Sequence, residues 1–389
     1  MPFQASDPPR HQNPLSQGGA ICNKPVMREK IIRAAIAASL GLPVPLIPAV
    51  GFAQDKVAAA KPVYPSPSEI VAAAKAEEWA AIAPSDLLVM DIAPDAKGRP
   101  RRVVIQLMPA PFSQGWVGNI RKLAAAKWWD GTSVNRVQDN YVVQWGDASE
   151  KKALLEGLRV MGEAEYVATD LVAIPDPRGR PRINYGLAAA MTRNAMIAAN
   201  GSVVVPPALK EALQSGKRPE NIETPEMGDA YAHFTTVALG WPIAATIGKE
   251  GDAFWPVHCY GMVGVGRNLS PDTGTGAELY TVIGHAPRHL DRNIALVGRV
   301  IEGIEHLSSL PRGGGALGFY EKEEERVPIL SVRMGHEIAD LPAFEYLYTE
   351  SETFAKYAEA RANRRDPFFN VPAGGADICN IPVPVRRKG

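Results

Sequence analysis

Apolar and polar positions alternate in a way that predicts a β-rich centre for this chain. Leu87–Ile92 is an apolar run of strand length, and Arg102–Met108 alternates as a second strand after a polar turn at Asp95–Pro100. Phe112–Ala126 follows with its apolar residues at helical spacing. The pattern therefore predicts a hairpin followed by a helix.

A second hairpin is predicted within Trp128–Asp147. Thr132–Val137 is rich in β-branched residues, Tyr141–Val143 is apolar, and the polar residues 138–140 between them are typical of a turn. Alternation along the first strand separates its arginine from most of the neighbouring valines. An arginine and a glutamine on adjacent strands, beside an aromatic ring, would make a polar spot on an apolar floor.

Helices are also predicted near both ends of the chain. Ser66, Pro67 and Glu69 form a capping box with proline at the first helical position, so a helix is expected from there to about Ile82. Near the other end, Glu352–Arg364 has the pattern of a charged amphipathic helix. The proline-rich residues that follow show no periodicity.

The N-terminal region predicts export. The first 26 residues are polar and are not expected to fold, and the basic segment Met27–Arg33 precedes Ala34–Ala53, which carries no charge. This order is typical of a secretory signal. The alternative is a membrane anchor, but three prolines in the apolar segment disfavour a spanning helix. Residues 1–53 are interpreted as a disordered leader plus signal peptide, with Met27 as an alternative start, and 54–84 as a linker and N-terminal helix.

The composition of the chain limits the classes of partner that it could bind. Its 389 residues, 46% of them hydrophobic, are enough for one large or two ordinary domains. The net charge is zero, which gives no electrostatic reason to expect nucleic acid or an anionic membrane as a partner. No cysteine spacing is typical of zinc, and Pro287 separates His285 from His289, so no metal site is expected.

Whether the cysteines form a disulfide also depends on export. Cleavage near Ala53 would remove Cys22 and leave Cys259 and Cys379, which could persist as a disulfide in an oxidising compartment. The alternative is two unrelated buried thiols. A disulfide would fasten the tail, Pro372–Lys388, because chain ends fray unless they are tied down.

The second hairpin resembles the signature of the cyclophilins, the peptidyl-prolyl cis-trans isomerases. Asn135-Arg136-Val137, Tyr141-Val142 and Gln144-Trp145-Gly146-Asp147 fill the places of the family's His-Arg-Val, Phe-Met and Gln-Gly-Gly-Asp. The spacing between the arginine and the glutamine is kept without a gap. The resemblance implies a mainly β fold, a closed eight-stranded antiparallel barrel capped by two helices.

The resemblance covers about residues 85–334 and is interrupted by an insertion at about 151–256. Within the insertion, helices are expected at Leu187–Ala199 and Pro207–Ser215, and the insertion is expected to pack against the barrel. Residues 335–389 are interpreted as a C-terminal extension. The family-like runs after the insertion are His258–Arg267, Thr275–Val282, His289–Asp291, Ala295–Gly303 and, as the closing strand, Ile329–Val332.

The resemblance also implies roles for individual residues. Arg136 would donate a hydrogen bond to the prolyl nitrogen as the amide twists, and Gln144 would orient it or bind the substrate backbone. Tyr141, Val142 and Tyr280 would form the apolar pocket for the proline ring. The residues expected to bind substrate are Asn135, Tyr141, Val142, Gly266, Arg267, Glu278, Tyr280 and His289.

Several of these positions depart from the family pattern. Glu278 replaces a glutamine and is expected to pair with Arg136 or Arg267, which would change the availability of the donor. The other departures are Asn135 for histidine, Tyr280 for phenylalanine, His289 for tryptophan, Ile294 for a pocket histidine and Val265-Gly266-Arg267 for the Met-Ala-Asn run that binds the substrate backbone.

Two interpretations of the function follow from the sequence. The first is an exported, monomeric isomerase that acts on proline-containing polypeptides in the periplasm and needs no cofactor. The second is a barrel of the same fold that binds unfolded or partner chains with little or no turnover. Arg136 is consistent with both, and a structural arginine in a surface ion pair is the alternative for that residue alone.

Overall fold

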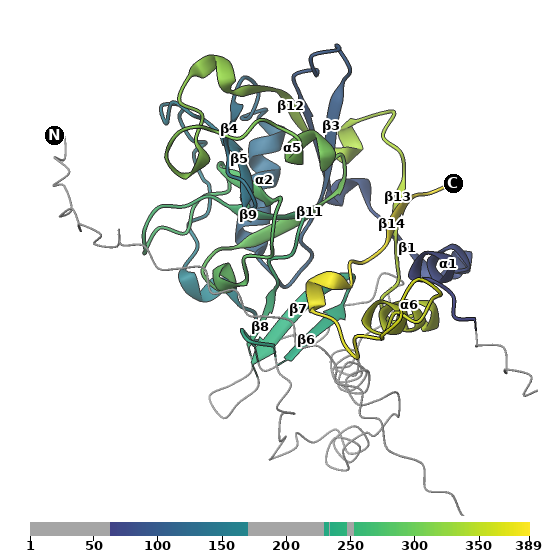
Figure 1. Cartoon of the computed structure of the whole chain (residues 1–389). Coiled ribbons are helices and arrows are strands. Elements are labelled where there is room, and N and C mark those ends of the chain that lie inside the picture. The colour runs from purple at the N-terminus through teal and green to yellow at the C-terminus, as the bar shows by residue number, and fades with distance from the viewer. Residues whose placement is uncertain (1–62, 170–228, 233, 247–252) are drawn as a thin grey trace, which may run out of the picture. The chain divides into compact units, whose positions relative to one another are not determined.

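The computed structural model describes residues 63–169, 229–232, 234–246 and 253–389 (Figure 1). The leader, the expected signal peptide and the two helices expected within residues 187–215 lie outside the described residues. Among the described ranges, none of the helices combines the length and the apolar character that crossing a bilayer requires.

The core of the described chain is a closed barrel of eight strands. The strands are β2 (Leu87–Ile92), β3 (Arg101–Leu107), β4 (Ser133–Val137), β5 (Val142–Gly146), β9 (Met262–Val265), β10 (Leu279–Val282), β11 (Leu296–Glu302) and β12 (Val327–Met334). They follow one another around the barrel in the order β10-β5-β4-β12-β2-β3-β11-β9, and each neighbouring pair is antiparallel. The predicted mainly β fold class is therefore confirmed.

Both hairpins lie where the alternation of residues predicts them. β2 pairs with β3 along its full length. β4 pairs with β5, which places Arg136 directly opposite Gln144. The turn between β4 and β5 contains Asn140 at φ 49°, a left-handed conformation that asparagine tolerates better than most residues. Local sequence therefore fixes the relative position of the arginine and the glutamine.

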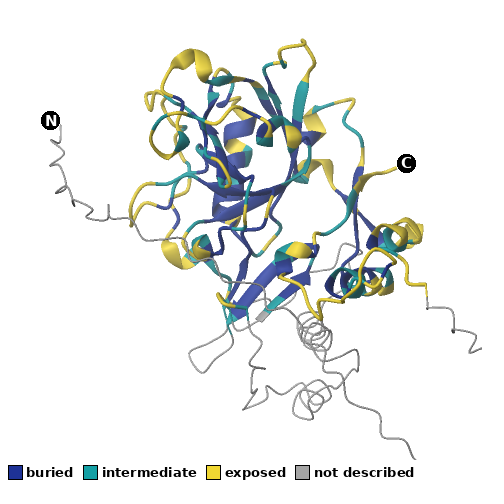
Figure 2. Ribbon diagram, viewed as in Figure 1, coloured by how far each residue is buried: buried dark blue, intermediate teal, exposed yellow. Residues whose placement is uncertain are grey.

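One helix provides most of the cap on the barrel. In α2 (Gln114–Ala125), the buried residues Trp116, Ile120 and Leu123 recur at helical spacing, as the periodicity predicts. The second capping helix is only the single turn α5 (Glu305–Ser308). Figure 2 shows the buried residues gathered in the barrel strands and in α2.

The N-terminal helix is shorter than predicted. α1 (Pro67–Ala72) has the capping box but ends after 6 residues, and β1 (Trp79–Ile82) occupies the end of the segment predicted to be helical. β1 pairs with β13 (Phe344–Leu347), which also pairs with β14 (Val385–Arg387). Pairing with a distant strand outweighs the helical preference of an alanine-rich segment.

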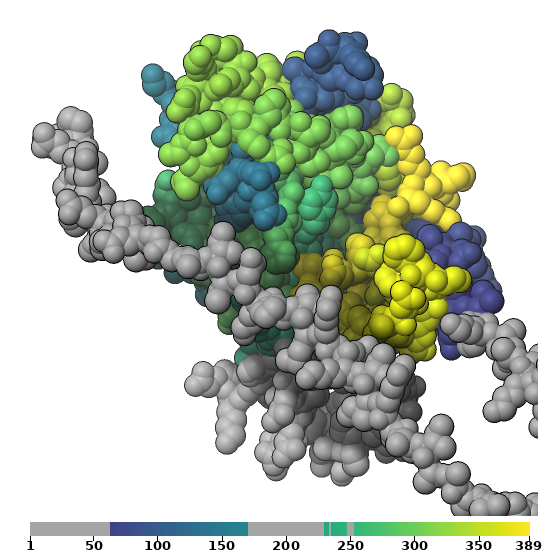
Figure 3. All heavy atoms as spheres, viewed as in Figure 1, coloured from purple at the N-terminus to yellow at the C-terminus, as the bar shows by residue number. Residues whose placement is uncertain are grey.

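The C-terminal extension packs back onto the N-terminal elements. α6 (Glu352–Ala362), the predicted amphipathic helix, buries Phe354 and Tyr357. It contacts α1, and the two helices lie side by side in Figures 1 and 3. Beyond α6, the tail is fastened by a disulfide between Cys259 and Cys379, whose Cα atoms lie 5.1 Å apart.

The described part of the insertion includes a small sheet. β6 (Phe234–Ala238), β7 (Trp241–Thr246) and β8 (Ala253–Pro256) form three antiparallel strands. The sheet packs on the barrel through Trp241, whose ring centroid lies 4.4 Å from the guanidinium of Arg299 on β11. The sequence pattern did not predict these strands, because short apolar runs hold too few residues to show a period of two.

Short 3-10 turns connect elements throughout the described chain. They occur at Ala76–Glu78, Pro84–Asp86, Glu163–Tyr166, Arg288–Leu290, Ala316–Gly318, Glu323–Glu325, Gly335–Glu337 and Ile378–Asn380.

Candidate active site

A cavity of about 850 Å³ lies on the barrel beside β4, β5 and β10. Nine of the ten residues that the sequence predicts for catalysis or substrate binding line it. They are Asn135, Arg136, Tyr141, Val142, Gln144, Gly266, Arg267, Glu278 and Tyr280. Residues from strands far apart in the sequence therefore meet in one place, as the resemblance implies.

His289 is the one predicted residue that the structure does not bring to the cavity. Its side chain is exposed in the short 3-10 turn Arg288–Leu290. In this turn Arg288 points inward and donates to Asp291, which leaves the following residue facing solvent. Leu290 and Ile294 line the cavity in its place, so the predicted role of His289 in substrate binding is corrected.

Arg136 is held in the cavity by three oxygen atoms. Its Nε donates to the carbonyl of Leu317 at 2.7 Å, and Nη1 donates to Oε1 of Gln144 at 3.1 Å. Nη2 donates to Oε1 of Gln138. A guanidinium carries five N–H hydrogens, so one hydrogen on each terminal nitrogen has no partner among the described residues. Arg136 is thus oriented in advance and still able to donate.

Two aromatic rings flank the same guanidinium. The ring centroids of Phe319 and Tyr141 lie 5.3 Å and 5.7 Å from its central carbon, within the range of cation–π attraction. Burial lowers the pKa of Arg136, but an arginine keeps its charge in proteins. No carboxylate in the described ranges forms an ion pair with Arg136. The alternative interpretation of this residue, a structural arginine in a surface ion pair, is therefore wrong.

Gln144 links Arg136 to Glu278. Its Oε1 accepts from Arg136, and its Nε2 lies at a long hydrogen-bond distance of 3.5 Å from Oε2 of Glu278. Burial raises the pKa of Glu278, although hydrogen bonds from Gln144, Asp147 and Asn135 oppose the rise. The cavity therefore contains a carboxyl group that is easier to protonate than an ordinary glutamate.

The ion pair expected of Glu278 is absent from the described residues. Arg267 instead donates to the backbone carbonyls of Asn293 at 3.0 Å and Asn268 at 2.7 Å. Arg136 is occupied by neutral oxygens. The expectation that Glu278 pairs with either arginine is therefore corrected, because backbone and amide acceptors lie closer to both guanidinium groups.

Two glycines leave room for the side chain of Glu278. A β-carbon at Gly146 would meet Oε1 of Glu278 at 1.9 Å, and one at Gly266 would meet its β-carbon at 2.9 Å. Contacts this short do not occur between unbonded atoms in a packed interior. The two glycines therefore provide the space that the glutamate side chain occupies.

The other end of the cavity is apolar. Tyr280 and Val142 are buried and pack with Val282, and the partly buried Tyr141 and Ile294 lie against them. Burial raises the pKa of Tyr280 well above its usual value, so the phenol stays neutral. An apolar wall beside a few fixed polar groups is typical of a site for a small apolar ring.

Three residues that hold Arg136 were not predicted from the sequence. Gln138 lies in the hairpin turn, while Leu317 and Phe319 come from the loop that follows α5. Phe319 forms an isolated β-bridge with Arg136, which brings this loop against β4. The glycines at 313–315 indicate a turn in the sequence, but nothing in the pattern identifies the strand that the turn packs on.

Asn135 lines the cavity, but the oxygen of its side chain is buried behind the surface. Its residue is 6% exposed, and its Oδ1 has no partner among the described residues. A buried acceptor without a partner costs free energy, so Oδ1 of Asn135 is a local weak point of the packing behind the cavity. Over the same ranges, no three His, Cys, Asp or Glu side chains gather as a metal site would require.

Comparison with known proteins finds the fold but no sequence relative. No family model and no curated protein matches the chain. The cyclophilin AquaCyp293 from Hirschia baltica aligns with a TM-score of 0.51 and 20% identity, over 83% of this chain and 98% of that chain. A cyclophilin-type peptidyl-prolyl cis-trans isomerase from Cryptosporidium parvum aligns with a TM-score of 0.30 and 9% identity, over 63% of this chain and 98% of that chain. The first likeness and the closed barrel show a cyclophilin-type fold.

Proposed function

We propose that this chain, which has a cyclophilin-type fold, is a peptidyl-prolyl cis-trans isomerase. The proposal is carried by the cavity that places Arg136, fixed by three oxygens and with N–H hydrogens to spare, close to an apolar wall. The donor and the wall come from β4, β5 and β10, which pair side by side in the barrel. A donor for the prolyl nitrogen and a pocket for the ring are what catalysis of rotation about an X-Pro bond uses.

The chemistry requires no covalent step. Rotation faces a barrier of about 18–20 kcal/mol because amide resonance must be broken. As the bond twists, the prolyl nitrogen regains a lone pair, and the Arg136 guanidinium donates to it. Because neither planar ground state offers that acceptor, the hydrogen bond stabilises the twisted state selectively, which lowers the barrier.

The substrate is a polypeptide that contains proline. Its proline ring lies against Tyr280, Val142 and Ile294, and Gln144 keeps Arg136 aimed at the ring nitrogen. The pocket holds the proline ring still while the residue before it rotates, so the binding energy is used to favour rotation about the X-Pro bond.

The test is a prolyl-isomerisation assay on the purified mature chain, with peptides that differ in the residue before proline. Catalysis that saturates with peptide concentration and is abolished by excess of a proline-containing competitor supports the proposal. If no peptide is turned over at micromolar protein, the isomerase function is wrong.

Binding without turnover is the second candidate function, and one observation favours it. Nε of Arg136 already donates to the carbonyl of Leu317. The exposed side chains of Leu317 and Phe319 border the cavity. If this loop stays in place, it limits how far the guanidinium can follow a twisting amide. A chain that suppresses aggregation of an unfolded protein in the absence of isomerase activity would then be a chaperone or scaffold.

Export to the periplasm is part of the proposal. It is supported by the signal-like residues before Gln54 and by the disulfide between Cys259 and Cys379, since disulfides persist in oxidising compartments. N-terminal sequencing of the protein from the cell envelope is expected to begin near Gln54. A product that retains residues 31–50 and stays with the membrane would favour an anchor instead.

A further inference from the structure

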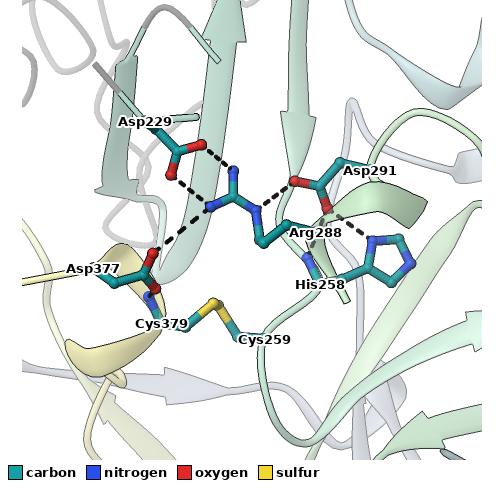
Figure 4. The surroundings of a disulfide bond; sticks show 7 residues. All are labelled: Asp229, His258, Cys259, Arg288, Asp291, Asp377 and Cys379. Atoms are coloured by element: carbon teal, nitrogen blue, oxygen red, sulfur yellow. Dashed lines mark hydrogen bonds and ion pairs between the residues drawn. A yellow bond between two sulfur atoms is a disulfide. The ribbon is translucent and has the colours of Figure 1, made fainter. Parts of the chain in front are cut away.

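Behind the apolar wall of the cavity, a buried series of polar contacts leads away from Tyr280. The Tyr280 hydroxyl lies 2.9 Å from Nε2 of His258, and Nδ1 of His258 lies 2.9 Å from Oδ1 of Asp291. Nε of Arg288 donates to Oδ2 of Asp291 at 2.6 Å, and its terminal nitrogens donate to Asp229 at 2.6 and 2.8 Å. Figure 4 shows these contacts from His258 onward. The four residues behind Tyr280, which are His258, Asp291, Arg288 and Asp229, are called the relay below.

The surroundings of His258 fix its protonation state. The ring is fully enclosed, and burial lowers its pKa although Asp291 opposes the effect, so the imidazole is neutral. A carboxylate can only accept a hydrogen bond, so Nδ1 carries the proton and donates to Asp291. Nε2 then accepts from the Tyr280 hydroxyl. The O–H of Tyr280 is therefore aimed at His258 and not at the cavity.

The charged members of the relay stabilise one another away from solvent. The side chains of Arg288, Asp291 and Asp229 are 4%, 2% and 9% exposed. Burial alone would lower the pKa of Arg288, but its hydrogen bonds to both carboxylates raise it. Burial alone would raise the pKa of Asp291, but hydrogen bonds from His258 and Arg288 lower it. Arg288 pairs with both carboxylates, so the loss of one group would leave the others incompletely paired.

The relay reaches two segments outside the barrel. Asp229 belongs to the insertion, and the carboxylate of Asp377 in the tail approaches Arg288 to 4.0 Å. Asp377 also accepts from the backbone N–H of Cys379 at 2.8 Å. Cys379 is joined to Cys259, the neighbour of the relay histidine, so the disulfide fastens the tail beside the relay (Figure 4).

The position of the Tyr280 ring depends on this backing. A buried hydroxyl without a partner costs free energy, and His258 supplies the partner. The two rings are nearly parallel, at 11° with centroids 6.4 Å apart. On another side the backbone of Gly264 is so close that a β-carbon there would meet the Tyr280 ring at 2.3 Å. A shift of His258 would therefore move the ring that forms the wall of the cavity.

We propose that the relay positions Tyr280 for substrate binding, and that the tail, fastened by the disulfide, braces the relay. His258 is then a positioning residue that acts through Tyr280. The proposal deepens the isomerase function and rests on it, because Tyr280 forms the wall for the proline ring. Opening the disulfide weakens binding of the peptide without slowing rotation once it is bound, since Arg136 is held by Gln138, Gln144 and Leu317 and not by the relay.

The kinetic test compares oxidised and reduced full-length mature protein, with and without the hydroxyl that joins Tyr280 to the relay. In the wild type, reduction is expected to raise KM for a prolyl peptide roughly 2- to 12-fold, the effect of weakening one neutral hydrogen bond, while kcat changes little. In Tyr280→Phe, reduction is expected to leave KM unchanged. Cys379→Ser is the matched control: without reductant it is expected to behave as the reduced wild type, and reductant is expected to have no further effect.

A second measurement does not depend on turnover. Nitrogen NMR of ¹⁵N-histidine-labelled protein reports the tautomer of His258, and Tyr280→Phe identifies its Nε2 signal because that substitution removes the hydrogen bond. The oxidised wild type is expected to show the neutral Nδ1–H tautomer, and reduction is expected to shift or broaden the Nε2 signal.

The results separate this inference from the proposed function. An Nε2 signal that ignores reduction, or an equal rise in KM for the wild type and Tyr280→Phe, would overturn the inference. A fall in thermal stability on reduction with no change in KM would also overturn it, because the tail would then only hold the fold together. An Nε2 signal that responds to reduction in a protein without isomerase activity would support the relay and refute the proposed function.

Discussion

The two ends of the cavity are held in opposite ways. At one end Arg136 is half-buried, and its hydrogen-bond partners are neutral oxygens of Gln138, Gln144 and Leu317. At the other end Tyr280 is buried, and behind it the charges of the relay compensate one another. At the first end a cation remains available to a ligand. At the second end the charges are buried behind Tyr280, where a ligand does not contact them.

The difference follows from what each end is proposed to do. A donor that must respond to a twisting amide needs its full charge and unused N–H hydrogens. A carboxylate partner would offset the charge and accept the hydrogens. A wall for a ring needs a fixed shape, which compensated buried charges can provide because moving any one of them leaves the others unpaired. The relay is therefore expected to affect stability and binding, and Arg136 is expected to affect the rate.

The largest effect is expected from breaking the relay at its cation. Arg288→Leu removes the partner of two buried carboxylates and is expected to lower the free energy of unfolding by about 3–5 kcal/mol. Arg136→Leu is the matched control: Arg136 is only half-buried and no carboxylate of the described chain depends on it, so its loss is expected to be the smaller one. Urea denaturation of both variants measures the difference. Equal losses would show that the two arginines are embedded in the same way and that the comparison is wrong.

The next effect concerns catalysis at the other end. Arg136→Ala removes a hydrogen bond from a charged donor, worth about 1.5–3 kcal/mol, which predicts a fall in kcat/KM of roughly 10- to 150-fold. The variant is expected to fold normally. Arg136→Lys keeps the charge without the planar fork, so it should recover only part of the loss. Wild-type turnover in Arg136→Ala would refute the proposed mechanism.

Much of the barrel end that holds Arg136 was predictable because its signal is local. The hairpin around residues 138–140 sets Arg136 opposite Gln144 through alternation and a turn, both of which are readable within one short stretch. The same holds for α2, whose buried face has a helical period. By contrast, β1 was predicted as helix because its pairing with β13 depends on residues at the far end of the chain.

The relay could not be predicted, although all its residues are visible in the sequence. Asp229, Asp291 and Asp377 are single carboxylates in separate segments, and no spacing marks them as partners of one arginine. The only signal was the pair Cys259 and Cys379, which indicated that the tail returns to the barrel. Long-range electrostatic contacts need the fold first, whereas a hairpin needs only its own residues.

A smaller effect is expected from Gln144, which orients Arg136. Gln144→Leu removes a neutral hydrogen bond, worth about 0.5–1.5 kcal/mol, and predicts a fall in kcat/KM of roughly 2- to 12-fold. The same substitution in the Arg136→Ala background is the control. If Gln144 acts only through Arg136, it has no further effect there, whereas a second loss would show that Gln144 also binds the substrate backbone.

The smallest effect tests the carboxyl group of Glu278, which Gln144 links to Arg136. Burial raises the pKa of Glu278 above the ordinary 4.5, so the folded state binds this proton more tightly than the unfolded state. The wild type is therefore relatively most stable below about pH 4.5 and loses this contribution as pH rises through the higher folded pKa. Glu278→Gln, which has no charge to bury, is expected to be more stable than the wild type at pH 7 and to lose that advantage towards pH 4. Urea denaturation at both pH values measures it, with the exposed Glu305→Gln as the control. An advantage that grows towards pH 4 would mean that Glu278 is stabilised as an anion, and both ends of the cavity would then hold compensated charge.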